Sequence, residues 1–225
     1  LPISPTLGVA TAVHALVGAT WRVAAPLTAE VTAFTTRAEG LAQRSDAAVP
    51  LRAQSLVQTG EGRALGVQAM LRLALGRRLS GWVSYALVRS ERRTSAAQPW
   101  RLFDQDQTHV LTALVQWEPG RGWELGARVR YATGMPRTPV VGAWFDAQRD
   151  QWQPVLGAQN AARLPDFVQL DVRVAKGFRL GNGRMEVSLE VQNITHRANP
   201  EEIVWNTTWT RSAYITGLPL LPVLG

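Results

Sequence analysis

The sequence lacks cysteine altogether and contains a single lysine, Lys176, among its 225 residues. The absence of cysteine excludes disulfide frameworks and thiolate metal sites. No run of about 18 apolar residues occurs, so the sequence predicts no transmembrane helix. The opening stretch has no basic segment ahead of its apolar residues, and we do not expect it to act as a secretory signal peptide. Helical periodicity is almost missing as well, which leaves extended structure as the main expectation.

The net charge of +7 comes almost entirely from arginine. Proteins that bind nucleic acid usually gather such charge into a stripe or a tail. Here the arginines are scattered singly through alternating segments and loops, with adjacent pairs only at Arg77–Arg78 and Arg92–Arg93. We therefore expect no nucleic-acid partner.

Apolar and polar residues alternate along most of the chain, which is typical of β-strands because successive side chains point to opposite faces. Every second residue from Trp123 to Tyr131 is apolar, for example, and the residues between them include Glu124 and two arginines. Most of the alternating segments exceed the usual length of about 5 or 6 residues in soluble proteins. The pattern predicts strands at about 9–22, 28–38, 54–75, 79–91, 108–117, 123–133, 166–177 and 184–193, with a less regular ninth at 207–217.

The connections between these strands are alternately short and long. The short ones are 24–28, 76–78, 118–122 and 177–183, and the long ones are 39–53, 92–107, 134–165 and 194–206. In an up-and-down meander, every tight turn then lies at one end and every long loop at the other, as in bacterial outer-membrane barrels. Eleven residues tilted by about 45° rise roughly 26 Å, which matches the apolar band of such barrels. The sequence therefore predicts an all-β chain, a partial antiparallel up-and-down transmembrane β-barrel of about eight to nine strands, in the bacterial outer membrane.

Each face of the predicted barrel has its own expected role. Tryptophans beside the short turns (Trp21, Trp82, Trp117 and Trp123) favour a membrane interface. The residues expected to contact lipid are Trp123, Leu125, Ala127, Val129, Tyr131, Met185, Val187, Leu189 and Val191. Those expected to line the lumen or contact a plug are Glu124, Arg128, Arg130, Asp171, Arg173, Glu186 and Glu190. The aromatic and charged residues of the longest loop suit ligand contact, and they are Trp144, Phe145, Arg149 and Trp152.

No catalytic, cofactor or metal site is predicted, so we do not expect an enzyme. The stretch DQDQT at 104–108 matches the aspartyl-phosphate pattern, but it lacks the buried strand that must precede the nucleophile. It also lacks the glycine and the distal glutamate of an EF-hand. The glycines of GEGRALG at 60–66 lack dinucleotide-binding spacing, and they are typical of bends or close backbone approach in a curved sheet. His14, His109 and His196 lie far apart, with no hydrolase motif beside them.

Three stretches together resemble the C-terminal half of the barrel of TonB-dependent outer-membrane receptors. GEGRALGVQAML is similar to the glycine-containing strand of that family, and DQDQTHVLTALV is similar to its strand start after a long outer loop. LEVQNITHRANP resembles the segment that follows the penultimate strand. The resemblance implies a 22-stranded barrel around an N-terminal plug domain. It also implies uptake of a scarce, bulky ligand (a metal chelate, cobalamin or a carbohydrate) driven through the TonB complex.

The sequence departs from the family pattern in two ways. It contains no plug domain, and it ends at LPLLPVLG without the terminal aromatic residue that such barrels usually carry. We therefore expect residues 1–225 to be the C-terminal portion of a receptor barrel, whose partners are lipid, the remaining strands, the plug and, through the plug, TonB. Two alternatives stay open: a small self-contained barrel acting as a porin, adhesin or membrane enzyme, and a soluble β-domain that binds a partner. In the latter, the apolar face would point into a core.

Overall fold

The computed structural model describes residues 7–45, 55–76 and 78–225, and these residues form strands and no helix. Nine strands follow one another across the principal sheet: β1 (Thr11–Ala24), β2 (Leu27–Arg44), β3 (Leu56–Leu75), β4 (Leu79–Arg93), β6 (His109–Gly120), β7 (Trp123–Ala132), β12 (Phe167–Leu180), β13 (Gly183–Gln192) and β16 (Leu221–Leu224). The shorter strands are β5 (Arg101–Leu102), β8 (Pro136–Arg137), β9 (Val140–Asp146), β10 (Gln151–Leu156), β11 (Ala162–Arg163), β14 (Pro200–Trp205) and β15 (Ser212–Thr216).

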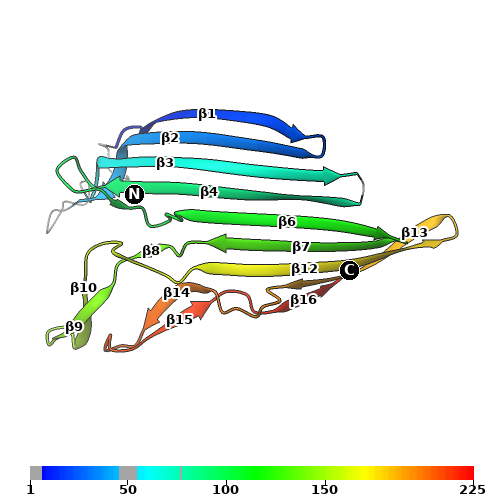
Figure 1. The fold of residues 1–225 in the computed structure, drawn as a ribbon. Helices are drawn as coiled ribbons and strands as arrows, with labels where there is room; N and C mark the ends of the chain where they lie inside the picture. The colour runs from blue at the N-terminus through cyan, green and yellow to red at the C-terminus, as the bar shows by residue number, and fades with distance from the viewer. Residues whose placement is uncertain (1–6, 46–54, 77) are drawn as a thin grey trace.

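The principal sheet is an antiparallel meander in the order β1-β2-β3-β4-β6-β7-β12-β13-β16. Figure 1 shows its strands side by side, with tight turns at one end and the long connections and small hairpins at the other. The expected separation of short and long connections is therefore confirmed for the described residues. Residues 46–54 and 77, which fall in or beside the connections expected at 39–53 and 76–78, lie outside that part of the chain. The predicted turn at 177–183 is too long, because β12 continues to Leu180 and β13 begins at Gly183.

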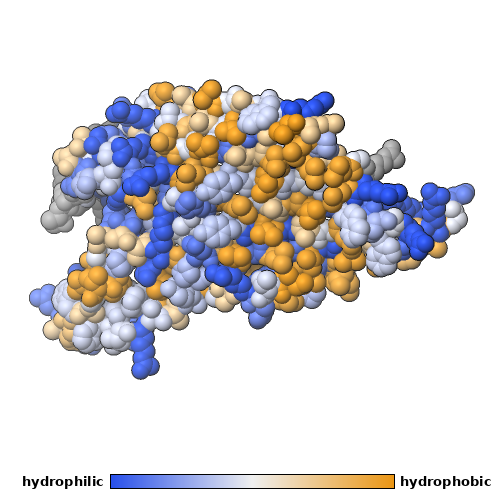
Figure 2. Space-filling model, in the orientation of Figure 1, coloured by the Kyte–Doolittle hydropathy of each residue, from blue (hydrophilic) through white to orange (hydrophobic). Residues whose placement is uncertain are grey.

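Cross-strand pairing carries the alternation of each strand across the whole sheet. Ala127 on β7 pairs with Val115 on β6 and with Val172 on β12, and Val172 pairs in turn with Val191 on β13. Apolar residues therefore stand in rows on one face, and the polar positions form rows on the other. Figure 2 shows a broad hydrophobic area over the strands, with hydrophilic residues toward both ends.

The apolar side chains lie on the outside of the sheet rather than in a core. Among the described residues, the only buried hydrophobic ones are Ala132 and Ala175. By contrast, Val17, Leu65 and Val187 are 72%, 66% and 49% exposed. In a soluble sandwich a second layer would cover such a face, and no described segment does so here. The chain thus has the fold of a partial transmembrane barrel.

In the described part of the chain, three of the long connections contain strands of their own: β5 lies within 92–107, β8 to β11 lie within 134–165, and β14 lies within 194–206. The loop expected at 134–165 holds the β9–β10 hairpin and the short β8–β11 pair. The ninth strand expected at 207–217 is wrong as a member of the principal sheet, because β15 in that stretch pairs with β14. The ninth strand of the sheet is instead β16, which pairs with β13. This strand has only four residues, one of which is Pro222, and it is too short to show alternation.

Candidate functional site

The polar face of β7, β12 and β13 carries a hydrogen-bonded network centred on Asp171, which is 4% exposed. Arg128, directly opposite on β7, donates from Nε and Nη2 to Asp171 Oδ2 over 2.9 and 2.8 Å. Asp171 Oδ1 accepts from Gln169 Nε2 at 2.6 Å and from the Asn193 backbone N–H at 2.9 Å. Gln169 Oε1 in turn accepts from Arg130 Nη2 at 2.7 Å. Burial of a carboxylate is costly unless a cation pairs with its charge and its lone pairs accept hydrogen bonds.

A second ionic group occupies the same face nearer the tight turns. Arg173 Nη2 lies 2.7 Å from Glu186 Oε1, and Arg173 Nη1 lies 3.7 Å from Glu124 Oε2. Arg184 Nη2 also lies 3.8 Å from Glu124 Oε1. Glu190 Oε1 accepts a hydrogen bond from Gln192 Nε2 at 3.2 Å. The structure therefore brings all seven residues expected at the lumen onto one face, most of them as members of two neighbouring networks. Their contact with a plug stays a prediction.

The nine residues expected to contact lipid stand on the opposite face of the same strands. At the tight-turn end, the Lys176 ammonium lies 4.9 Å from the centroid of the Trp123 ring. At the other end, the Tyr131 hydroxyl donates to Asp166 Oδ2 at 2.8 Å. Both contacts are typical of side chains whose apolar part lies in hydrocarbon while a polar tip reaches the interface.

The four residues expected to contact ligand all belong to the β9–β10 hairpin, but they face different directions. Phe145 lies opposite Trp152 with ring centroids 5.6 Å apart, so these two rings share one face. Trp144 is adjacent to Phe145 in β9 and therefore points to the other face. Arg149 lies in the turn and forms an ion pair with Asp146 at 3.5 Å. The hairpin presents a pair of rings on one side and a single tryptophan on the other.

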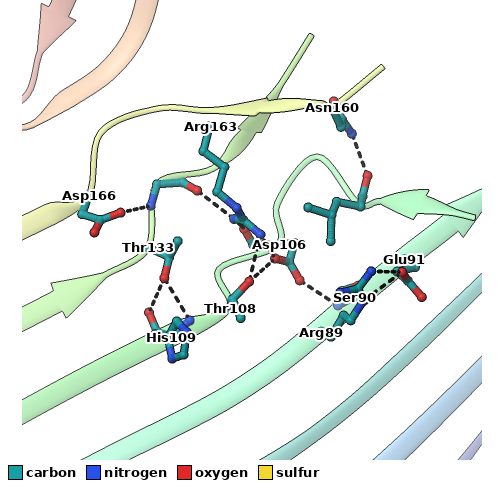
Figure 3. A network of polar contacts seen from close by, with 12 residues as sticks. Arg89, Ser90, Glu91, Asp106, Thr108, His109, Thr133, Asn160, Arg163 and Asp166 are labelled. Atoms are coloured by element: carbon teal, nitrogen blue, oxygen red, sulfur yellow. Dashed lines mark hydrogen bonds and ion pairs between the residues drawn. The ribbon is translucent and has the colours of Figure 1, made fainter. Parts of the chain in front are cut away.

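Asp106, a buried residue whose role the sequence did not indicate, connects the loops at the long-loop end of the sheet (Figure 3). The side chain of Asp106 is fully buried, and its Oδ2 accepts from Arg163 Nη2 at 2.6 Å and from the Thr108 hydroxyl at 2.9 Å. Its Oδ1 accepts from the Ser90 backbone N–H at 2.7 Å. The stretch DQDQT is therefore a structural anchor. Only Thr108 is near Asp106 in sequence, and no local pattern indicates partners as distant as Ser90 and Arg163.

Two further contacts fix the long loop between β7 and β12. Asn160 donates from Nδ2 to the Leu102 carbonyl at 2.7 Å and to Asp104 Oδ1 at 2.6 Å. Asp166 accepts from the Tyr131 hydroxyl and from the Gly134 backbone N–H at 3.1 Å. These two hydrogen bonds hold the pKa of Asp166 below its usual value, and the hydrogen bond from Tyr131 has the larger effect. The loop is thus tied both to its neighbour and to the ends of β7 and β12.

An open pocket of about 480 Å³ lies where the long-loop end meets the polar face. Its wall combines apolar, aromatic and charged residues, among them Gln107, Arg130, Met135, Phe167 and Glu201. The Arg130 guanidinium lies 5.5 Å from the centroid of the Phe167 ring. A mostly apolar concave surface with a few charged groups is the usual form of a small-ligand site.

Within the described part of the chain, no group of three or more His, Cys, Asp or Glu residues is arranged to hold a metal ion. No described helix is long and apolar enough to span a membrane.

Comparison with solved structures relates this arrangement to bacterial outer-membrane receptors. The ferric-catecholate import receptor Fiu of Escherichia coli K12 superposes with a TM-score of 0.65, at 16% identity over 96% of this chain. The FrpB iron transporter of Neisseria meningitidis gives 0.63, at 15% identity over 99%. The ferripyoverdine receptor of the Pseudomonas aeruginosa outer membrane also gives 0.63, at 12% identity over 94%. No protein-family model matches the chain, and no curated protein matches it by sequence.

The chain covers 27%, 32% and 26% of the lengths of these three proteins. At such low identities the similarity establishes the fold, which is that of one section of an outer-membrane receptor barrel. The sequence resemblance to TonB-dependent receptors and the expected outer-membrane location agree with these neighbours.

Proposed function

We propose that this chain is the C-terminal part of the barrel of a TonB-dependent receptor, which imports a scarce, bulky ligand across the bacterial outer membrane. The observation that carries the proposal is the uncovered apolar face of a meander whose tight turns and long loops lie at opposite ends. Lipid covers such a face in an outer-membrane barrel, with the long loops outside the cell. The similarity of the fold to outer-membrane receptors supports the same conclusion.

The two networks on the polar face suit contact with a plug domain that fills the lumen. Asp171 is already satisfied within the barrel wall, so it positions Arg128 rather than offering an empty acceptor. Glu190 and Arg173, nearer the solvent, retain capacity for partners from another domain. Ion pairs of this exposed kind contribute little stability each, which fits a surface that must release the plug during transport.

The pocket and the β9–β10 hairpin suit capture of the ligand from outside. The pocket offers a cation in Arg130, an aromatic ring in Phe167 and hydrogen-bonding groups in Gln107 and Glu201. We propose a metal chelate as the ligand, because the similar structures are named for ferric catecholate, iron and ferripyoverdine. The chelate is cargo, and transport requires no covalent chemistry from these residues.

The test uses the full-length receptor that carries these residues, expressed in cells that lack their own iron-chelate receptors. We expect saturable uptake of radiolabelled iron presented as a catecholate or hydroxycarboxylate chelate, and loss of that uptake when TonB is deleted. Uptake of cobalamin or a maltooligosaccharide in place of iron would correct the ligand class. Non-saturable, TonB-independent flux would contradict the proposal and favour a porin.

A further inference from the structure

A row of arginines crosses the apolar face near its long-loop end. Arg37 on β2 lies directly opposite Arg63 on β3, and Arg63 lies opposite Glu91 on β4. Arg89 precedes Glu91 by two residues and therefore shares its face. The side chains of Arg37, Arg63 and Arg89 are 68%, 51% and 68% exposed. We refer to these three residues as the arginine row.

Glu91 forms ion pairs with two members of the row, Arg63 and Arg89. Its Oε2 accepts from Arg63 Nε at 2.7 Å and lies 2.6 Å from Arg63 Nη2. Its Oε1 accepts from Arg89 Nε at 2.9 Å and lies 2.7 Å from Arg89 Nη2. The residue is 6% exposed. One edge of each guanidinium is therefore used by the same buried carboxylate, and the Nη1 groups remain available in the described part of the chain.

The other charged residues around the row leave a positive surplus. Glu39 pairs with Arg37 through Nε at 3.0 Å. Glu61 pairs with Arg93 at 2.7 Å, and both of those side chains are largely covered. The three arginines of the row thus share two carboxylates. Because Arg37 and Arg63 are like charges at directly opposed positions, their pairing is unfavourable unless an anion lies between or above them.

Trp100 and the apolar residues beside the row show where the arginine row lies along the strands relative to the apolar band. The Arg63 guanidinium lies 4.3 Å from the centroid of the Trp100 ring, as expected for an aromatic side chain at an interface. Immediately toward the tight turns, Val67 pairs with Leu87, and these side chains are 45% and 44% exposed. The arginine row is therefore the first charged layer beyond the apolar band on three neighbouring strands.

We propose that the arginine row binds the phosphate of an anionic lipid in the outer leaflet. Guanidinium groups bind phosphate oxygens through paired, charge-assisted hydrogen bonds, and the free edges of Arg63 and Arg89 point away from Glu91. The inference rests on the proposed function, because only membrane insertion by way of the apolar face places the row at headgroup height. The lipid would occupy the outside of the barrel wall, on the face opposite to the pocket and the two polar networks.

The test measures lipid binding to the full-length receptor in nanodiscs of neutral phosphatidylcholine, titrated with diphosphorylated lipid A and followed by native mass spectrometry. The test variant combines Arg37→Gln, Arg63→Gln and Arg89→Gln. The matched control combines Arg22→Gln, Arg72→Gln and Arg78→Gln, which remove the same charge at the tight-turn end. We expect the test variant to bind lipid A about tenfold more weakly, and the control to bind like the wild type.

Arg37→Gln alone serves as a second variant, because Arg37 pairs with the exposed Glu39 and its loss leaves Glu91 paired with Arg63 and Arg89. We expect weaker binding in the same direction, with the heat-modifiable mobility of the folded barrel preserved. Equal binding of lipid A by wild type and both variants would overturn the inference. Displacement of lipid A by an equal concentration of inorganic phosphate would also overturn it, since it would indicate a soluble-anion site. Ligand uptake by the same variants tests the proposed function separately, because uptake can persist when lipid binding is lost.

Discussion

At the scale of single residues, buried carboxylates hold the long-loop end of the barrel wall together. Asp106, Asp171 and Glu91 are 1%, 4% and 6% exposed, and each is bound by at least one arginine from another strand or loop. Removal of one partner from such a pair leaves an uncompensated charge. These residues are therefore the positions at which a single substitution has the largest effect.

We expect Asp106→Ala to loosen the loop between β7 and β12. The change removes the partner of Arg163 and the acceptor of the Ser90 N–H, at a cost of roughly 2–4 kcal/mol. Limited proteolysis of the full-length receptor should then cleave within 134–165 faster than in the wild type. Glu202→Ala, at an exposed position on β14, is the matched control. Equal cleavage rates for Asp106→Ala and the control would show that the network does not hold the loop.

Asp166 makes the same junction sensitive to acid. Its pKa is lowered in the folded protein, mainly by the Tyr131 hydroxyl. The stabilisation is therefore present above the unfolded pKa of about 3.9 and is lost as the pH falls through the folded value. Hydrogen exchange at the Gly134 amide, corrected for its intrinsic rate, should lose protection below about pH 4. In Tyr131→Phe the loss should begin at higher pH, and an unchanged profile would contradict this role.

At the scale of elements, the strands of the principal sheet were predictable, whereas the small hairpins and β16 were not. Period-two alternation over long strands is a local signal, and it located the strands of the principal sheet from β1 to β13. The β9 and β10 strands have only seven and six residues, VVGAWFD and QWQPVL, and apolar residues stand side by side in both, so the same signal is weak there. β16 contains a proline, which usually marks an edge or the absence of a strand. The polar face followed from alternation, but the pairing of Asp106 with Arg163 depends on tertiary structure.

The β9–β10 hairpin should contribute to ligand capture. Its rings are exposed, and the Trp209 indole N–H donates to the Trp152 carbonyl at 3.2 Å, which links the hairpin to the loop before β15. We expect deletion of 140–157 in the full-length receptor to weaken ligand binding about tenfold, since aromatic residues dominate most binding surfaces. Equilibrium binding to intact cells measures the effect. Unchanged affinity and uptake would remove the hairpin from the mechanism.

The alternating faces of β7 can be tested by chemical labelling. The chain has no cysteine, so single-cysteine variants carry no background. In a receptor with its plug removed, a charged maleimide should label positions 126, 128 and 130 and spare 125, 127 and 129, because an apolar medium suppresses thiolate formation.

A soluble core would protect the odd positions equally well, so a second measurement is needed. A quencher attached to lipid acyl chains should reduce the fluorescence of a probe at 127 and leave a probe at 128 unaffected. If neither probe is quenched, the apolar face does not contact lipid.

At the scale of the whole molecule, the sheet has two open edges. Among the described residues, β1 pairs only with β2, and the tight-turn half of β13 pairs only with β12, because β16 pairs with just Leu189–Gln192. Inside a membrane each unpaired backbone group costs several kcal/mol. Barrel diameter also grows with strand number, and nine strands are too few to surround a plug domain. The remaining strands of a receptor would pair with both edges.

We therefore predict that residues 1–225 alone form no stable transporting barrel. The measurement is refolding of this segment into detergent micelles and into liposomes, followed by gel mobility with and without heating and by protease digestion. We expect protease-sensitive or aggregated material, because the edges of β1 and β13 can pair only with other copies of the chain. The full-length receptor, refolded in the same way, provides the control and should give a heat-modifiable, protease-resistant band. A heat-modifiable monomer from residues 1–225 would mean that these strands close on themselves, and it would favour the small self-contained barrel over the receptor.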